Sequence, residues 1–120
     1  MTETYPSQGT TTIAPDVLLT IAQLATLEVD GVSRFCHPTG VAFNRLLKRG
    51  QAREGVYIEI IDDVVFIDLY VALKSETNVR EVSHTIQHDV TREISEMVGM
   101  QVGRVNIHIE DIDYPTETEA

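Results

Sequence analysis

The 120-residue chain has little of several features that mark common protein classes. It contains one cysteine, Cys36, which cannot form an internal disulfide and so favours a reducing, cytoplasmic setting. No apolar run approaches the roughly 18–20 residues that a membrane-spanning helix needs, and the polar N-terminal residues lack a signal-peptide core. With 42% hydrophobic and 23% charged residues, the composition instead predicts a single soluble intracellular domain with one modest core.

Basic residues are also scarce, because 9 lysines and arginines stand against 19 acidic residues, for a net charge of −10. Nucleic-acid binding rests on basic side chains that neutralise phosphates, so this balance argues against a nucleic-acid partner. Five of the basic residues lie in residues 31–53, which contain no acid. There Arg45, Lys48 and Arg49 stand among apolar residues and form a candidate contact for an acidic partner or an anionic membrane surface. The alternative is a solvated loop that lies over the acidic body.

Hydrophobic periodicity predicts an α+β fold with two helices packed on one face of a small antiparallel or mixed β-sheet, in the order β-α-(β)-β-β-α-β. The elements are expected over residues 10–13, 15–28, 32–36, 56–61, 64–74, 78–98 and 100–109. One domain then covers residues 9–113, with a disordered N-terminus (1–8), a mobile basic loop (37–55) and an acidic tail (114–120). The tail is expected to fray from Glu110.

The two helices are predicted from one apolar stripe each. In the first helix, Val17, Ile21, Leu24 and Ala25 share the face that should pack on the sheet. The second helix should begin at Asn78 with a capping box to Glu81 and end at Gly99. Its stripe is longer and stronger, and consists of Val79, Val82, Ile86, Val90, Ile94 and Met97.

Residues 56–74 form the clearest predicted hairpin, with Asp62-Asp63 at its turn. A continuous aliphatic set should face the core: Val65, Ile67, Leu69, Val71 and Leu73. Tyr57, Phe66 and Tyr70 point to the opposite face, where they are candidate partner contacts. The equal alternative is that the rings lie flat or are covered by the long loop. Acidic neighbours on this face disfavour the base stacking of RNA-recognition modules.

Other candidate sites have simpler explanations. His84 and His88 have the i, i+4 spacing of a metal site, but Thr85 stands where the metalloprotease motif needs glutamate, so a solvated helix face is preferred. An opportunistic metal site at this pair stays open. Cys36-His37 has no third residue to orient the histidine, and Asp62-Asp63 is typical of a turn. We therefore expect no enzyme activity, catalytic residue or cofactor.

The chain carries a series of landmarks whose order and spacing are specific: Thr12-Ile13 through Val17, Ile21-Ala22, Glu28-Val29-Asp30-Gly31-Val32, Gly55-Val56, Asp68-Leu69-Tyr70-Val71, Asn78-Val79, Ile86-Gln87 with Val90, Met97-Val98-Gly99, and Val102 with Val105-Asn106-Ile107. This series resembles that of the bacterial alkaline-shock-protein family, also called the Gls-type general stress protein family. The landmarks cover about residues 9–112. One departure is Lys74-Ser75-Glu76, where many relatives carry Tyr-Gly.

The resemblance implies a small acidic cytoplasmic protein of α+β fold without an established catalytic site. Some members are held near the membrane by an integral membrane partner and are linked to cell-envelope or alkaline stress; others are associated with fatty-acid metabolism genes. The preferred hypothesis is a non-enzymatic stress-response or envelope-homeostasis protein that acts by protein–protein contact. The alternative is an accessory or regulatory subunit for a fatty-acid-metabolism enzyme. Whether such a subunit binds a ligand stays open. Whether the chain forms a homo-oligomer stays open.

Overall fold

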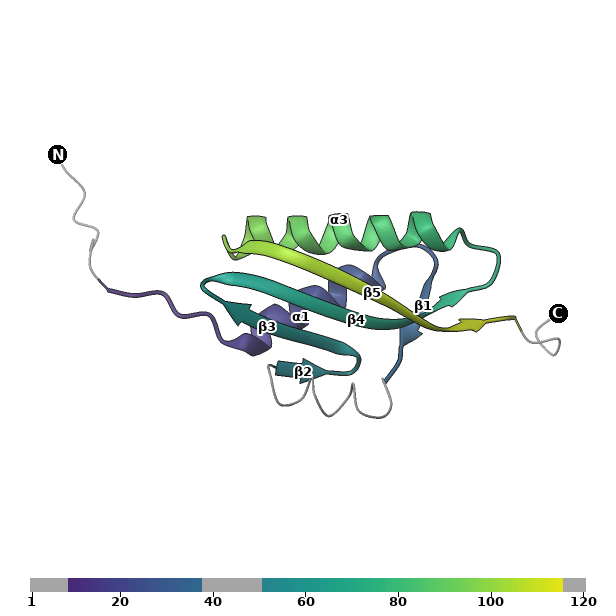
Figure 1. The fold of residues 1–120 in the computed structure, drawn as a ribbon, viewed down its shortest axis with the longest axis horizontal. Coiled ribbons are helices and arrows are strands. Elements are labelled where there is room, and N and C mark those ends of the chain that lie inside the picture. Colours follow the sequence, from purple (N-terminus) through teal and green to yellow (C-terminus); the bar gives the residue numbers. More distant parts are fainter. Residues whose placement is uncertain (1–8, 38–50, 116–120) are drawn as a thin grey trace.

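The long strand β4 (Val64–Lys74) organises the sheet in the computed structural model, which describes residues 9–37 and 51–115 (Figure 1). One edge of β4 pairs antiparallel first with β3 (Val56–Ile61) and then with β1 (Val32–Phe35). Its other edge pairs along its whole length, in parallel, with β5 (Gln101–Asp113). The sheet is therefore mixed. Helices α1 (Pro15–Leu27) and α3 (Val79–Met97) pack on it, which confirms the predicted α+β fold.

A tight turn at Asp62-Asp63 sets the register of the hairpin formed by β3 and β4. Asp62 and Asp63 have φ values of 52° and 66° and join Ile61 directly to its partner Val64. Two successive left-handed residues are the geometry of a type I′ turn, which matches the twist of paired strands. The interpretation of this acidic pair as a turn is therefore confirmed.

Helix α3 agrees with its predicted stripe. Val82, Ile86, Val90 and Ile94 are buried in the common core, where α3 packs beside α1 and against β5. The Asn78 side chain accepts a hydrogen bond from the Glu81 backbone N–H at 3.0 Å, as an N-cap should. Val79 and Met97, at the two ends of the stripe, extend beyond the core and are exposed.

Helix α1 forms where it was predicted but buries a different face. Its buried residues are Leu18, Leu19, Ala22, Ala25 and Thr26, whereas Val17 and Leu24 are 45% and 57% exposed. The small side chains of Ala22 and Ala25 let the helix backbone approach the sheet. The Thr26 hydroxyl donates to the Ala22 carbonyl at 2.7 Å, so this threonine can be buried without an unsatisfied polar group. Of the predicted stripe, Ala25 is buried and Ile21 is half-buried against the core, so the prediction is wrong at Val17 and Leu24.

Three boundaries also differ from the prediction. Residues 10–13 form no strand, because they lie exposed and unpaired with the sheet. Within the predicted 37–55 loop, β2 (Gln51–Arg53) pairs with β3 through a tight turn at Glu54-Gly55, where both φ values are positive. Strand β5 continues through Glu110 to Asp113 instead of fraying. Residues 1–8, 38–50 and 116–120 lie outside the described part of the chain, so the expectations for those residues stay predictions.

Candidate interaction surfaces

The sheet face opposite the helices, here called the outer face, carries a packed group of aromatic side chains. Tyr70 of β4 stacks on the imidazole of His108 of β5, with ring centroids 4.3 Å apart and planes 9° apart. Tyr57 of β3 meets Tyr70 edge-on at 5.5 Å. The parallel register places Tyr70 directly beside His108, and the hairpin register places Tyr57 one row away. Three strands thus contribute to one cluster.

Asp68 holds the histidine in this cluster. Its carboxylate lies 3.0 Å from Nε2 of His108 and accepts a hydrogen bond from the Asn106 side-chain amide at 3.2 Å. Burial raises the pKa of the Tyr70 phenol, and the charges of Asp68 and Glu110 raise it further. Burial likewise raises the pKa of Tyr57. Both phenols therefore stay neutral at physiological pH and serve as packed, polar-tipped rings.

This packing agrees with the alternative that the Tyr57 and Tyr70 rings are covered rather than presented to a partner. Tyr57 and Tyr70 are only 4% and 7% exposed, although no helix of the described residues covers the outer face. Phe66 is half-buried, and the guanidinium of Arg104 lies 5.5 Å from its ring centroid. Of the three aromatic candidates, Phe66 is thus the most accessible. The basic candidates Arg45, Lys48 and Arg49 lie outside the described residues.

Cys36 does not have the surroundings of a nucleophile. Partial burial raises the pKa of its thiol, an effect that outweighs the nearby charge of Arg34. Arg34 is instead engaged with β5, where it donates to both carboxylate oxygens of Asp113 at 2.9 and 3.0 Å and to Asp111 at 3.1 Å. The Ser33 hydroxyl donates to the same Asp113 carboxylate at 2.6 Å. This network connects β1 to the end of β5.

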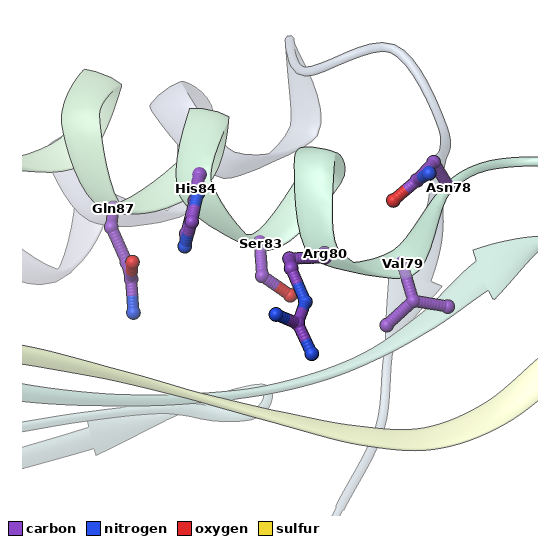
Figure 2. Close-up of a pocket in the computed structure, with 6 residues that line it drawn as sticks. All are labelled: Asn78, Val79, Arg80, Ser83, His84 and Gln87. Carbon is purple, nitrogen blue, oxygen red and sulfur yellow. The ribbon is translucent and has the colours of Figure 1, made fainter.

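The histidine pair lies on the solvated side of α3, as expected. His84 and His88 are exposed, and Nδ1 of His88 lies 3.2 Å from the Asp89 carboxylate. An open hollow of about 540 Å³ lies along this helix. Figure 2 shows that Arg80, Ser83 and Gln87, which line it, point from α3 toward β5. Nε2 of Gln87 donates to the Val105 carbonyl at 3.0 Å and so fixes the helix to the strand. Across residues 9–37 and 51–115, no group of three histidine, cysteine or acidic side chains could hold a metal.

The largest unexplained feature is the exposed side of α1, here called the α1 face. It consists of Val17, Leu24 and Leu27, which are 45%, 57% and 44% exposed. Val17 and Leu24 are two helical turns apart and point in nearly the same direction. No charged residue of α1 stands between Asp16 and Glu28, so this side of the helix is uncharged, with Thr20 as a polar residue between Val17 and Leu24.

Strand β2 fixes one end of the α1 face. Arg53 donates to the Thr20 hydroxyl at 2.7 Å and forms an ion pair with Asp16 at 2.9 Å. Beside these contacts lies an open hollow of about 280 Å³, which Val17, Ile21 and the 66%-exposed Met97 of α3 also line. The sequence contains a signal for this surface, because a helix that is apolar on all sides has more apolar surface than one sheet can cover.

The comparison with known families decides the classification of the chain. The model of the ASP23 family, which is described by a cell envelope-related function, matches residues 3–114. The chain belongs to this family. Membership in the ASP23 family confirms the resemblance to alkaline-shock proteins.

Individual relatives agree with this classification. The chain is 31% identical over 113 residues to YqhY of Bacillus subtilis (strain 168), covering 92% of this chain and 82% of YqhY. It is 33% identical over 105 residues to Spy1535 of Streptococcus pyogenes serotype M6, covering 87% and 79% of the two chains. Both relatives are named as uncharacterized proteins, so they transfer no activity to this ASP23-family member.

A solved structure of a MamM CTD variant superposes with a TM-score of 0.49 at 14% identity, over 80% of this chain and 95% of the other. No helix among the described residues is both long enough and apolar enough to cross a membrane.

Proposed function

We propose that this protein is non-enzymatic and acts in cell-envelope homeostasis and the stress response by holding another protein on its α1 face. The observation that carries the proposal is the exposure of Val17, Leu24 and Leu27 on a helix whose other side is fully packed. Contiguous exposed apolar surface on a folded domain marks an interaction site. The family's cell envelope-related function supplies the cellular setting.

The chemistry of the remaining surfaces supports a binding role over a catalytic one. The pKa of the Cys36 thiol is raised, whereas a nucleophilic cysteine needs a lowered one. Asp68 holds the imidazole of His108, and one face of this imidazole is stacked on the ring of Tyr70. This geometry gives His108 a packing role in the cluster. An anchoring partner in the membrane would place this protein near the cytoplasmic side of the envelope.

Affinity capture from a native lysate that retains its membrane fraction tests the proposal. The bait is the full chain, and the matched variants are Leu24→Ser on the α1 face and Ile61→Ser on the hairpin, where Ile61 is 47% exposed. We expect wild type and Ile61→Ser to retain the same envelope protein, identified by mass spectrometry, and Leu24→Ser to lose it. Equal retention by Leu24→Ser would show that the α1 face is not the contact.

The same experiment addresses the alternative function. An accessory subunit of a fatty-acid-metabolism enzyme would retain carboxylase or acyl-kinase subunits in place of envelope proteins. The family description favours the envelope role over this alternative.

A further inference from the structure

We infer that the partner's contribution to the α1 face is a basic amphipathic helix, which lies beside α1 and along the adjoining edge of α3. This inference rests on the proposed function and specifies the partner's chemistry.

The shape of the α1 face fits a helix. Its exposed side chains repeat over two helical turns, from Val17 to Leu24, with Leu27 one turn further. Apolar residues at these spacings are how one helix receives the apolar stripe of another. The hollow between Thr20, Ile21 and Met97 provides a recess for a side chain at one end of this seam.

The charges around the α1 face select a basic partner. Met97 of α3 borders the same hollow as Val17 of α1, so its side of α3 lies toward α1. Glu93 and Asp89 precede Met97 by four and eight residues and therefore lie along the same side of α3. Exposed Glu96 lies next to this row. At the far end of α1, Glu28 and Asp30 are exposed.

Within residues 9–37 and 51–115, two arginines offset part of this charge: Arg53 pairs with Asp16, and Arg92 pairs with Glu93 at 3.3 Å. In the same part of the chain Glu28, Asp30 and Glu96 form no ion pair, so the described border of the α1 face keeps an acidic excess. Lysines and arginines that flank an apolar stripe would therefore meet opposite charges on both sides of the seam. A second copy of this chain would bring the same acidic borders together, and the chain's net charge of −10 opposes an anionic membrane surface as well.

The test measures fluorescence anisotropy with a labelled helical peptide of leucine and lysine, in which the leucines follow the heptad a and d positions. One control peptide replaces every lysine with glutamate, and a second contains the same residues in an order that leaves no apolar stripe. At about 0.15 M salt, where charges more than about 8 Å apart are screened, we expect saturable binding of the leucine–lysine helix only. If the scrambled peptide bound equally well, net charge alone would account for the binding, and the inference would be wrong.

Protein variants locate the peptide. Leu24→Ser should weaken binding by about tenfold, which corresponds to 1.4 kcal/mol, whereas Ile61→Ser should bind as wild type does. The double variant Glu93→Gln with Glu96→Gln should weaken binding of the lysine peptide and reduce its dependence on salt. Unchanged binding by Leu24→Ser, checked as folded by circular dichroism, would contradict the inference.

Two results separate this inference from the proposed function. Suppose that Leu24→Ser loses the captured envelope protein, but that the leucine–lysine peptide binds the variant and the wild type equally. The α1 face would then be a contact surface whose partner is not a basic helix. If sedimentation shows a wild-type dimer that Leu24→Ser dissociates, the α1 face belongs to a second copy and the inference is wrong.

Discussion

The phenol ring of Tyr70 lies flat against the imidazole of His108, with planes 9° apart and centroids 4.3 Å apart. The two residues come from neighbouring parallel strands, so this contact connects the central strand β4 to the edge strand β5. It lies on the outer face of the sheet, which no helix of the described residues covers. Asp68 holds His108 from the same row of side chains. The outer face therefore has a small packed layer of its own, which contributes to the stability of the domain.

Truncating Tyr70 should destabilise the domain nearly as much as truncating a residue of the main core. Leu69→Ala removes a fully buried side chain and should lower the free energy of unfolding by about 2–5 kcal/mol. Tyr70→Ser removes a ring that is 7% exposed and should cost on the order of 3 kcal/mol. Urea denaturation of both variants measures these values. Phe66→Ser, at a half-buried ring, is the control and should cost less; if Tyr70→Ser is as mild as Phe66→Ser, the outer layer is not structural.

Gly55 should tolerate no side chain. Its φ is +85°, and an added Cβ would lie 2.5 Å from the Cys36 carbonyl oxygen and 2.9 Å from that of Tyr70. Both contacts are with backbone, which cannot move without breaking the pairing of β1 and β4. Gly55→Ala should therefore lower the free energy of unfolding by more than the roughly 1–2 kcal/mol that the left-handed backbone conformation alone costs an alanine.

Gly99→Ala is the matched control for this variant. Gly99 has a similar φ of +80° but nothing within 4 Å of an added Cβ. Its substitution should cost only the conformational strain of about 1–2 kcal/mol. Thermal unfolding of the two variants compares them directly. Equal costs would mean that the close backbone approach at Gly55 does not constrain the fold.

The Asp113 contacts should make stability depend on pH in the acid range. The hydrogen bond from Arg34, and then that from Ser33, lowers the pKa of the Asp113 carboxyl below its usual value. A carboxyl with a lowered pKa in the folded state stabilises the fold above its unfolded pKa of about 3.9 and loses this contribution as the pH falls through the lower value. Asp113→Asn should therefore melt below wild type near neutral pH and converge with it in acid.

A titration of melting temperature for both proteins between about pH 2 and 7 measures this difference. Since the ion pair is exposed, added salt should reduce the difference at neutral pH. A gap between the two melting curves that stays constant through the acid range would show that Asp113 acts by a route other than its charge.

The sequence predicts the α3 and hairpin regions well because each contains one unambiguous pattern. In α3, Val82, Ile86, Val90 and Ile94 alternate with polar residues, so only one face can be apolar. In β4, pleat geometry alone separates Leu69 from Tyr70. These local patterns were enough for the fold class.

The candidate contact surface could not be predicted in the same way. Pleat geometry gives the direction of Tyr70 but not what lies beside it, and His108 reaches it only through the parallel register of two strands that α3 separates in sequence. The loop predicted over residues 37–55 includes Arg53 and gives no position for its side chain, so the sequence does not predict its contacts with Asp16 and Thr20. For α1, apolar residues occur on every side, and periodicity does not choose between Val17 and Leu18.

The same substitution at two leucines of α1 should change stability by very different amounts. Leu18 is fully buried in the core, so Leu18→Ala should lower the free energy of unfolding by about 2–5 kcal/mol. Leu24 is 57% exposed on the same helix. Leu24→Ala should change the free energy of unfolding by no more than about 0.5 kcal/mol, since alanine is also the better helix former. Chemical denaturation gives both values. A large loss at Leu24 would mean that the α1 face is covered within the isolated protein, and it would then be unavailable to the partner helix that we propose.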